Sequence, residues 1–478
     1  MSTTSLGRRV FTGSAWQFAS KFSSAFITLF VQMILARMLL PEDFALIAIS
    51  VIFLELSEIL VDAGFGSALI QKEKLDSTDL SSAFICNVLF ALICYGILYY
   101  AAPSIEAFFA IPHLSKVVRV SALGIPISSF GMIQNSLLAR DLRFKERTKA
   151  TIISIGISSI VCIVLAFFGF GMWALVLQIL LNRIIYVFEL FKIFPVLPVR
   201  NFSFKKAQSL LLFGSSVLGV NLIAVLLRQL PSIVIGRAYS AHTLAYVNMA
   251  SKIEKTASVS IEGSLMQALY PAYSRLQCDS VKLAEALRTS VRLGNFIYLP
   301  VLFGIAASAH NLVFVLFGSS WMPSVPYLQA FCISALLILV FDALTQSLLS
   351  LGHTKKYFLS TLANLLVSIG AMAFCISFGS FWVLIALLPG KVVGIILAYY
   401  FLSKEIQLSF KALSFDFIKS FLASLMMGLI VLLLEVFVPA PRFFVLCLQI
   451  LIGIAVYILA SLFTQRPLLI EFRRLIKG

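Results

Sequence analysis

Long apolar stretches separated by short polar gaps run through the whole chain. A membrane-spanning helix needs about 20 mostly apolar residues, and each stretch reaches roughly that length. Pro41, Gly169 and Pro439 mark some of the turns between stretches. The pattern therefore predicts an all-α membrane protein with about 14 transmembrane helices. The predicted spans cover residues 14–38, 42–65, 81–102, 117–138, 148–169, 171–192, 209–235, 244–269, 290–312, 324–351, 357–378, 381–403, 415–437 and 443–464.

Positive charge is concentrated in alternate gaps between these spans. The gaps in phase with the two ends of the chain hold 26 of the 37 Lys and Arg residues: Arg8, Arg9, Lys72, Lys74, Arg140, Arg143, Lys145, Arg147, Lys149, Lys192, Arg200, Lys205, Lys206, Arg275, Lys282, Arg288, Arg292, Lys355, Lys356, Lys404, Lys411, Lys419, Arg466, Arg473, Arg474 and Lys477. The other gaps hold Arg37, Lys116, Arg119, Arg237 and Arg442. Positive loops stay cytoplasmic, so both termini are predicted to be cytoplasmic and the number of spans even.

Composition narrows the class of protein further. The chain has 478 residues, of which 60% are hydrophobic and 12% charged, whereas soluble domains carry about 25% charged residues. The net charge of +16 is spread over eight predicted cytoplasmic segments, which indicates topology signals and contacts with anionic membrane lipids rather than a nucleic-acid surface. The cysteines and histidines have no metal-ligand spacing, and no cofactor is expected. The first apolar run is too long for a cleavable signal peptide.

A weak internal repeat appears at an offset of 200 residues. The segment from Leu35-Ala36-Arg37 to Phe44-Ala45 aligns with that from Ile235-Gly236-Arg237 to Leu244-Ala245, and Gly13-Ser14 matches Gly214-Ser215 after one indel. Six spans separate the copies, so both have the same orientation, as in transporters whose repeats are related by an axis along the membrane normal. The repeat predicts two parallel six-helix lobes enclosing a central pathway. The predicted domains are residues 1–200, residues 201–410 and, for helices 13–14 with a cytoplasmic tail, residues 411–478.

Several charged residues fall inside the predicted spans, where a charge costs about 2.5–3.5 kcal/mol on insertion scales. These residues must face one another or water rather than lipid tails. The cations, which are candidates for an anion-binding cavity, are Lys21, Arg183, Arg228, Lys252, Lys255 and Lys391. The acids are Glu55, Glu58, Asp62, Glu189, Glu254, Glu262 and Asp342. Polar residues that could set specificity are Asn135, Gln178, Asn182, Asn221 and Gln267.

Glu55, Glu58 and Asp62 have the spacing i, i+3, i+7, which places three carboxylates on one face of the second helix. Two interpretations remain open. They could belong to a structural ion-pair network, with Lys21 and Glu58 at similar depth as one pair, or they could form a proton or cation coupling site.

Lys252 and Lys255 share a face of the eighth helix with no acid on that face. They indicate an anionic ligand, unless Glu262 or another helix neutralises them. Asp342 shares a face with Gln346 and is either a coupling acid or a hydrogen-bonding residue.

Two further charged residues have a less regular setting. Arg183 could pair with Glu189, although the spacing i, i+6 is unfavourable. Lys391 follows Pro389-Gly390, which predicts a helix break there.

Three stretches resemble a known family. They are Asp62-Ala63-Gly64-Phe65-Gly66-Ser67-Ala68-Leu69-Ile70-Gln71, Leu138-Ala139-Arg140-Asp141-Leu142-Arg143-Phe144 and Leu269-Tyr270-Pro271-Ala272-Tyr273-Ser274-Arg275-Leu276-Gln277. Together they resemble bacterial polysaccharide transporters of the Wzx type, in the branch that includes the colanic acid exporter. This family belongs to the multidrug/oligosaccharidyl-lipid/polysaccharide exporter superfamily.

The resemblance implies a flippase of the bacterial inner membrane. Such proteins move undecaprenyl-pyrophosphate-linked oligosaccharides from the inner to the outer leaflet by alternating access, for capsule, O-antigen or exopolysaccharide synthesis. It implies membrane lipids, a polysaccharide polymerase and chain-length machinery as partners, and coupling to a proton gradient, a sodium gradient or the membrane potential. In the related lipid II flippases, cavity cations lie on helices 1, 2 and 8. Here Lys21 and Lys252/Lys255 lie on helices 1 and 8, but helix 2 offers acids.

Two other classes of function compete with the flippase. A cation-coupled drug antiporter of the same fold would need an apolar or acidic cavity. A membrane-embedded polymerase or glycosyltransferase would need sizeable loops at the face where the chemistry takes place, and every loop here is short. The chain has no P-loop and no Gly-rich phosphate cradle, so it is not expected to be an enzyme or an ATP-driven pump.

Overall fold

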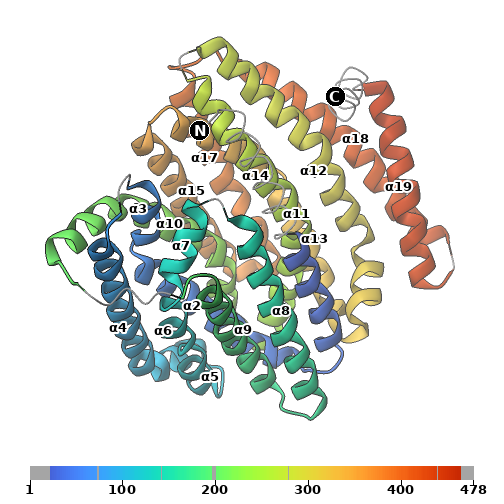
Figure 1. Ribbon diagram of the computed structural model, residues 1–478. Helices are drawn as coiled ribbons and strands as arrows, with labels where there is room; N and C mark the ends of the chain where they lie inside the picture. Colours follow the sequence, from blue (N-terminus) through green and yellow to red (C-terminus); the bar gives the residue numbers. More distant parts are fainter. Residues whose placement is uncertain are drawn as a thin grey trace. The chain divides into compact units, whose positions relative to one another are not determined.

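The computed structural model describes residues 22–72, 75–141, 143–195, 201–277, 279–438 and 440–464. Within these ranges all regular structure is helical, as the sequence predicts. Residues 22–35 form the first described helix. The others are α2 (Pro41–Asp62), α3 (Phe65–Gln71), α4 (Ser77–Phe109), α5 (Leu114–Ser121), α6 (Gly124–Ser129), α7 (Met132–Arg140), α8 (Phe144–Phe167), α9 (Met172–Ile193), α10 (Phe204–Ala238), α11 (Ala241–Arg275), α12 (Ser280–Phe317), η1 (Ser319–Ser324), α13 (Val325–Ala335), α14 (Ile338–Ser350), α15 (Thr354–Cys375), η2 (Ile376–Phe378), α16 (Ser380–Ile385), α17 (Leu387–Leu402), α18 (Phe410–Phe437) and α19 (Arg442–Thr464) (Figure 1).

Every predicted span overlaps helical residues. Among the described residues, eleven helices are long and apolar enough to cross a membrane. The pair Leu114–Ser129 and Met132–Arg140, bent by 49°, makes up to twelve. The two other predicted spans are the short helix over residues 22–35 and α11, which carries four charged residues between positions 252 and 262. The number of fourteen transmembrane helices and the orientation of the protein in the bilayer therefore stay predictions.

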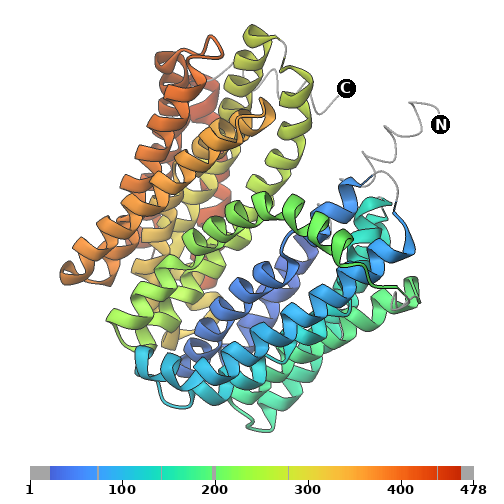
Figure 2. The same ribbon diagram turned by 90° about the vertical axis from the view of Figure 1, so that its left-hand side faces the viewer.

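The chain divides into two compact units, residues 1–245 and 246–478. In unit 1, α2 packs against α4, α9 and α10, and α8 lies along α9 (Figures 1 and 2). In unit 2, α12 packs along α18 and α19, and α15 packs along α17. The predicted domain boundaries after residues 200 and 410 stay predictions.

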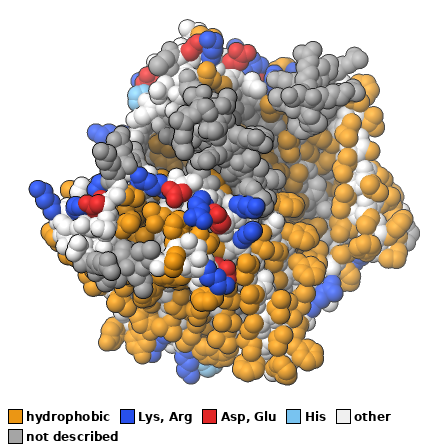
Figure 3. Space-filling model, viewed as in Figure 1, with side chains coloured by type: hydrophobic (Ala, Val, Ile, Leu, Met, Phe, Trp, Pro, Cys, Tyr) orange, Lys and Arg blue, Asp and Glu red, His pale blue; other side chains and the backbone are white. Residues whose placement is uncertain are grey.

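The surface and the interior have the polarity of a protein that lies in lipid. Phe167, Phe437 and Phe463 are among many large apolar side chains exposed on the outside. Hydrophobic side chains cover much of the face in Figure 3. Small polar residues such as Ser82 and Ser420 are buried instead, which is typical of helix packing in membranes. This arrangement supports the assignment as a multi-pass membrane protein.

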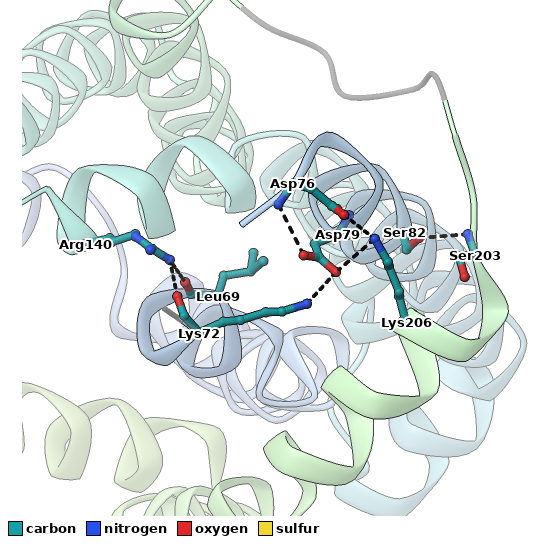
Figure 4. Close-up of polar contacts among 8 residues, drawn as sticks. All are labelled: Leu69, Lys72, Asp76, Asp79, Ser82, Arg140, Ser203 and Lys206. Atoms are coloured by element: carbon teal, nitrogen blue, oxygen red, sulfur yellow. Dashed lines mark hydrogen bonds and ion pairs between the residues drawn. The ribbon is translucent and has the colours of Figure 1, made fainter. Parts of the chain in front are cut away.

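Connections that the charge pattern predicts to lie on one side of the membrane meet at one end of unit 1. Lys72, Arg140 and Ser203, from three predicted cytoplasmic connections, lie in one cluster of polar contacts (Figure 4). Four predicted external connections also meet, because residues at or next to each of them line one cavity. These residues are 42–43, 109–113, 170–173 and 237–241. The alternation of charge along the sequence thus corresponds to a real grouping of loops in space.

Candidate functional site

The three carboxylates of α2 line two cavities of unit 1. Glu55, Glu58 and Asp62 border a cavity of about 370 Å³ together with residues of α10, among them Asn221. Glu58 and Asp62 also border a cavity of about 400 Å³, whose other walls come from α4, α6, α7 and α9. The i, i+3, i+7 spacing brings the acids to this common face, as the sequence predicts.

Glu55 binds two neighbouring side chains of α10. Its Oε2 accepts hydrogen bonds from Arg228 Nη2 at 3.0 Å and from Gln229 Nε2 at 2.8 Å. Glu55 lies fourteen residues after Pro41, the first residue of α2, or about 21 Å along the helix at 1.5 Å per residue. If α2 crosses the bilayer as predicted, that depth is well inside a hydrocarbon core about 30 Å thick. The pair therefore joins two helices where neither charge could face lipid.

Glu58 binds a second arginine, on α9. Its Oε1 forms an ion pair with Arg183 Nη1, and the same nitrogen donates to Ser128 Oγ at 2.5 Å. Gly124 of α6 leaves the space that this side chain needs, because a Cβ at position 124 would lie 2.6 Å from Arg183 Cδ. Two of the three acids in the acidic row of α2 (Glu55, Glu58 and Asp62) therefore form ion pairs, which connect α2 with α10 and α9.

One pairing suggested by the sequence is wrong. Glu189 does not bind Arg183; its Oε1 accepts from Lys192 Nζ at 2.6 Å. The spacing i, i+3 brings those two side chains to one face of the helix, whereas i, i+6 does not. Lys21, the suggested partner of Glu58, lies outside the described residues, as do the side chains of Glu262 and Gln267.

Asp62 has a local structural role. Its Oδ1 accepts a hydrogen bond from the backbone N–H of Gly66 at 3.1 Å, where α2 ends and α3 begins. Ala63 and Gly64 have φ values of 42° and 80°, so the chain turns through two left-handed residues between the helices. A Cβ at Gly66 would lie 2.9 Å from Asp62 Oδ1. The Asp-Ala-Gly-Phe-Gly motif is thus a helix–turn–helix joint held by its first residue, and a coupling role for Asp62 stays a prediction.

The predicted cations of unit 2 lie in two places. On α11, Lys252 is exposed and Lys255 partly buried, whereas Glu254 is buried and its Oε1 accepts from Ser258 Oγ at 2.5 Å. The two lysines and Glu254 thus point to different sides of α11. Lys391 Nζ donates to the Ser334 carbonyl oxygen at 2.6 Å, and it lies near the C-terminal end of α13, where a cation is favoured.

The helix break predicted at Pro389-Gly390 lies slightly earlier. α16 ends at Ile385 and α17 begins at Leu387, so Pro389 occupies the first turn of α17, where its missing N–H has no helical partner to lose. Asp342 is partly buried on α14, and its role stays a prediction.

The predicted cytoplasmic end of unit 1 holds a second network, which sequence reasoning missed (Figure 4). Lys72 Nζ contacts Asp79 Oδ1 at 2.7 Å, and Lys206 Nζ contacts Asp76 Oδ2. Asp76 and Asp79 also cap the start of α4 reciprocally, each accepting from the other's backbone N–H. The hydrogen bond with Lys206 lowers the pKa of Asp76 to about 2. The signal for this cap was present in the sequence, as two acids three residues apart ahead of an apolar run.

Arg140 links two of the family-like motifs in this network. Its Nη1 donates to the carbonyl oxygens of Leu69 at 2.9 Å and Lys72 at 2.6 Å. These carbonyls belong to the last turn and the C-cap of α3. The carbonyl oxygens at the end of an α-helix have no backbone N–H donor within the helix. The first motif supplies the helix end and the second supplies the cation that caps it.

Charged groups beside the cavities of unit 1 form ion pairs. Among the described residues, no three His, Cys, Asp or Glu side chains form a group that could hold a metal ion. Two arginines instead lie against carboxylates at the walls of these two cavities. Such arginines suit a phosphate or another oxyanion.

Comparison with known proteins identifies a family. A family model described as "Polysaccharide biosynthesis protein" matches residues 34–326. The succinoglycan biosynthesis transport protein ExoT of Rhizobium meliloti (strain 1021) is 25% identical over 375 residues, covering 78% of this chain and 76% of the relative. The teichuronic acid biosynthesis protein TuaB of Bacillus subtilis (strain 168) is 23% identical over 434 residues, with 89% of each chain covered. The lipopolysaccharide biosynthesis protein WzxC of Escherichia coli (strain K12) is 22% identical over 341 residues, covering 70% and 68%.

Solved structures with the same fold come from two kinds of transporter. The lipid II flippase MurJ in an inward closed conformation has a TM-score of 0.76 at 18% identity, over 95% of this chain and 99% of that one. An inward-facing multidrug resistance transporter of the MATE family has a TM-score of 0.65 at 16% identity, over 82% and 95%. At these identities the likeness concerns the fold alone.

Proposed function

The chain belongs to the polysaccharide biosynthesis protein family, and on that premise we propose that it is a flippase for lipid-linked oligosaccharides. It is a multi-pass protein of the bacterial inner membrane and a transporter rather than an enzyme. The proposed substrate is an undecaprenyl-pyrophosphate-linked oligosaccharide repeat unit, moved from the inner to the outer leaflet by alternating access. The relatives named for succinoglycan, teichuronic acid and lipopolysaccharide support a role in surface polysaccharide synthesis.

The single observation that carries the proposal is the pairing of two carboxylates of α2, Glu55 and Glu58, with arginines inside the predicted spans and beside two cavities. A charge placed in the bilayer costs about 2.5–3.5 kcal/mol, and packing alone would be served by apolar residues. A headgroup that carries a pyrophosphate needs such cations on its way across the membrane, and its lipid tail does not.

We assign the pyrophosphate to the predicted cations Lys21, Arg183, Arg228, Lys252, Lys255 and Lys391. Lys252 and Lys255, which share a face of α11, are the proposed primary contacts. Arg183 and Arg228 are proposed as contacts that become available when a substrate oxyanion displaces their carboxylate partners. Lys391 is proposed to act less directly, because its ammonium group already binds the end of α13.

The same exchange provides a proposed route to coupling. When an oxyanion takes Arg228 or Arg183, Glu55 or Glu58 loses its partner. A carboxylate left without a cation in a low-dielectric site is destabilised unless it binds a proton or a metal cation. Uptake of a cation at Glu55 or Glu58 would therefore accompany substrate movement. Asp62 and Asp342 are the other proposed coupling acids.

The test is a leaflet assay in the host after deletion of the gene. Wild type, Lys252→Ala/Lys255→Ala and the matched control Lys404→Ala/Lys411→Ala are returned at equal membrane level. Both double variants remove two positive charges, but the control pair lies outside the predicted spans 381–403 and 415–437, whereas Lys252 and Lys255 lie within the predicted span 244–269. We expect the oligosaccharide to accumulate on the cytoplasmic side in the deletion strain, and wild type and control to clear it while Lys252→Ala/Lys255→Ala does not.

Appearance of the oligosaccharide in the outer leaflet without this protein, and without a second flippase, would refute the proposal. A cation-coupled drug antiporter is then the candidate to test, since the MATE likeness is compatible with it at the level of the fold. The family assignment favours the flippase.

A further inference from the structure

A cavity of about 770 Å³ lies at the predicted external end of unit 1. It shares no lining residue with the two cavities along the acidic row of α2. All four predicted external connections of unit 1 contribute to its wall, at residues 42–43, 109–113, 170–173 and 237–241. Its size is within the range of about 300–1,000 Å³ that accommodates organic ligands, so it can hold more than a single ion.

Four aromatic side chains contribute to this wall. Trp173 and Tyr239 are partly buried and line the cavity, and Phe109 and Phe170 border it as well. Trp and Tyr combine an apolar ring face with a polar N–H or O–H group. A sugar ring has the matching chemistry, because one of its faces carries C–H bonds while its rim carries hydroxyl groups.

The charged residues of the wall already have local contacts. Glu42 Oε1 lies 2.9 Å from His242 Nε2, and Asp43 Oδ2 accepts from the Leu40 backbone N–H at 3.3 Å. The guanidinium of Arg237 lies over the Phe108 ring, 5.2 Å from its centroid. Acids and a cation of opposite sign line the same space, so neither a small anion nor an organic cation has a clear electrostatic advantage.

We propose that this cavity is an outer saccharide site, bounded by Glu42, Phe109, Trp173, Arg237 and Tyr239, that binds neutral, hydroxyl-rich sugar residues of the oligosaccharide after they have crossed the membrane. The assignment rests on the proposed flippase function and deepens it. Carboxylate and guanidinium groups at the rim would hydrogen-bond hydroxyls, and the rings would stack on the C–H face. A site at this end favours the translocated state, and it must bind weakly because product release can limit turnover.

The test uses the full-length protein in lipid nanodiscs and a defined probe. The probe is the free oligosaccharide that mild acid releases from the host's own lipid-linked intermediates, labelled at its reducing end. Binding is followed by fluorescence anisotropy for wild type, Trp173→Ala, Tyr239→Ala and Trp173→Phe. Trp382→Ala is the matched control, because Trp382 is also near a predicted external helix end but is 53% exposed on α16 of unit 2.

We expect Trp173→Ala and Tyr239→Ala to raise the dissociation constant at least about tenfold, which is about 1.4 kcal/mol. Trp173→Phe keeps an aromatic face and should retain most of the affinity, and Trp382→Ala should match wild type. The affinity should change little between low and high salt, because exposed charge interactions are screened and neutral contacts are not.

Two results would overturn the assignment. One is a probe affinity that is the same in Trp173→Ala, Tyr239→Ala and wild type. The other is displacement of the probe by tetraphenylphosphonium, which would mark the cavity as an organic-cation site. Trp173→Phe protects the test against misfolding, since it keeps an aromatic ring in the wall and removes less volume than Trp173→Ala.

The leaflet assay separates this assignment from the proposed function. If wild type restores flipping but probe binding does not depend on Trp173 and Tyr239, the outer saccharide site is refuted and the flippase function stands. If wild type does not restore flipping, the flippase function is refuted. The assignment of the cavity as an outer saccharide site then loses its basis, even if the free oligosaccharide still binds.

Discussion

Replacing Arg140 by Ala should loosen α3 without disturbing the helices around it. α3 has only seven residues, and isolated helices shorter than about 12–15 residues are marginal in water. Its end is held by Arg140, whose Nη1 donates to the carbonyl oxygens of Leu69 and Lys72. Removing the guanidinium leaves both carbonyls without this donor and removes a cation from the negative end of the helix.

The size of the effect follows from these two contacts. Hydrogen bonds to charged groups contribute about 1.5–3 kcal/mol each, but the contact with Lys72 is exposed to solvent, so its contribution is reduced to about 0.5–1 kcal/mol. The opening free energy of α3 should therefore fall by about 2–4 kcal/mol. Since each 1.4 kcal/mol changes an equilibrium constant tenfold, the equilibrium constant for opening of α3 should rise between about 30-fold and several hundred-fold. Arg140→Lys keeps the charge but loses the planar fork, so its effect should be smaller.

Hydrogen–deuterium exchange of α3 amides in nanodiscs measures this opening directly. The matched control is Arg143→Ala, which removes a nearby positive charge whose partner is Glu146 at 2.9 Å rather than α3. We expect faster exchange over Phe65–Gln71 in Arg140→Ala alone. Equal exchange of α3 in wild type and Arg140→Ala would refute the assignment of Arg140 as its C-terminal cap.

Two further variants test the other networks of unit 1. Gly124→Ala places a Cβ 2.6 Å from Arg183 Cδ and should reduce flipping several-fold at normal membrane level, whereas Gly156→Ala, where nothing lies within 4 Å of the added Cβ, should leave flipping unchanged. The Asp76 carboxylate has a pKa of about 2 against an ordinary 3.8, so it should stay ionised down to about pH 2. The stabilisation from its contact with Lys206 is complete above about pH 4 and is lost as the pH falls through about 2. Carbon-13 NMR of labelled aspartate should place its titration there, and Lys206→Gln should move it back towards 3.8; a titration near 3.8 in wild type would contradict the contact.

The helical segments and the grouping of their connections could be predicted from the sequence because both depend on one-dimensional signals. Apolar length marks the helices, and alternation of Lys and Arg marks which connections lie together. The ends of helices were less predictable. α12 begins at Ser280, ten residues before its predicted span, because a helix continues beyond the bilayer when its first turns are capped, here by Asp279, whose side chain accepts from the Lys282 N–H.

The partners of the buried charges could not be predicted, because depth and spacing along one helix do not fix which neighbour faces it. The sequence placed three acids on one face of α2 and suggested Lys21 for Glu58. It gave no reason to choose Arg183 of α9, which is 125 positions away, and it treated Asp62 as equivalent to the other two. Packing of α2 against α9 and α10 decides these pairs, and that packing is a property of the folded unit.

The position of the pairs within a single unit bears on what could break them. Glu55 with Arg228, and Glu58 with Arg183, each join helices of unit 1. In the proposed alternating access the lobes move largely as bodies, so Glu58 and Arg183, which lie both in unit 1 and in the predicted lobe of residues 1–200, would not be strained by the motion itself. A ligand that competes for the arginine is then the most direct way to separate them, and an oxyanion is the ligand with that chemistry. The pair of Glu58 and Arg183 is therefore better suited to responding to an oxyanion, such as the proposed pyrophosphate, than to acting as a hinge or a gate.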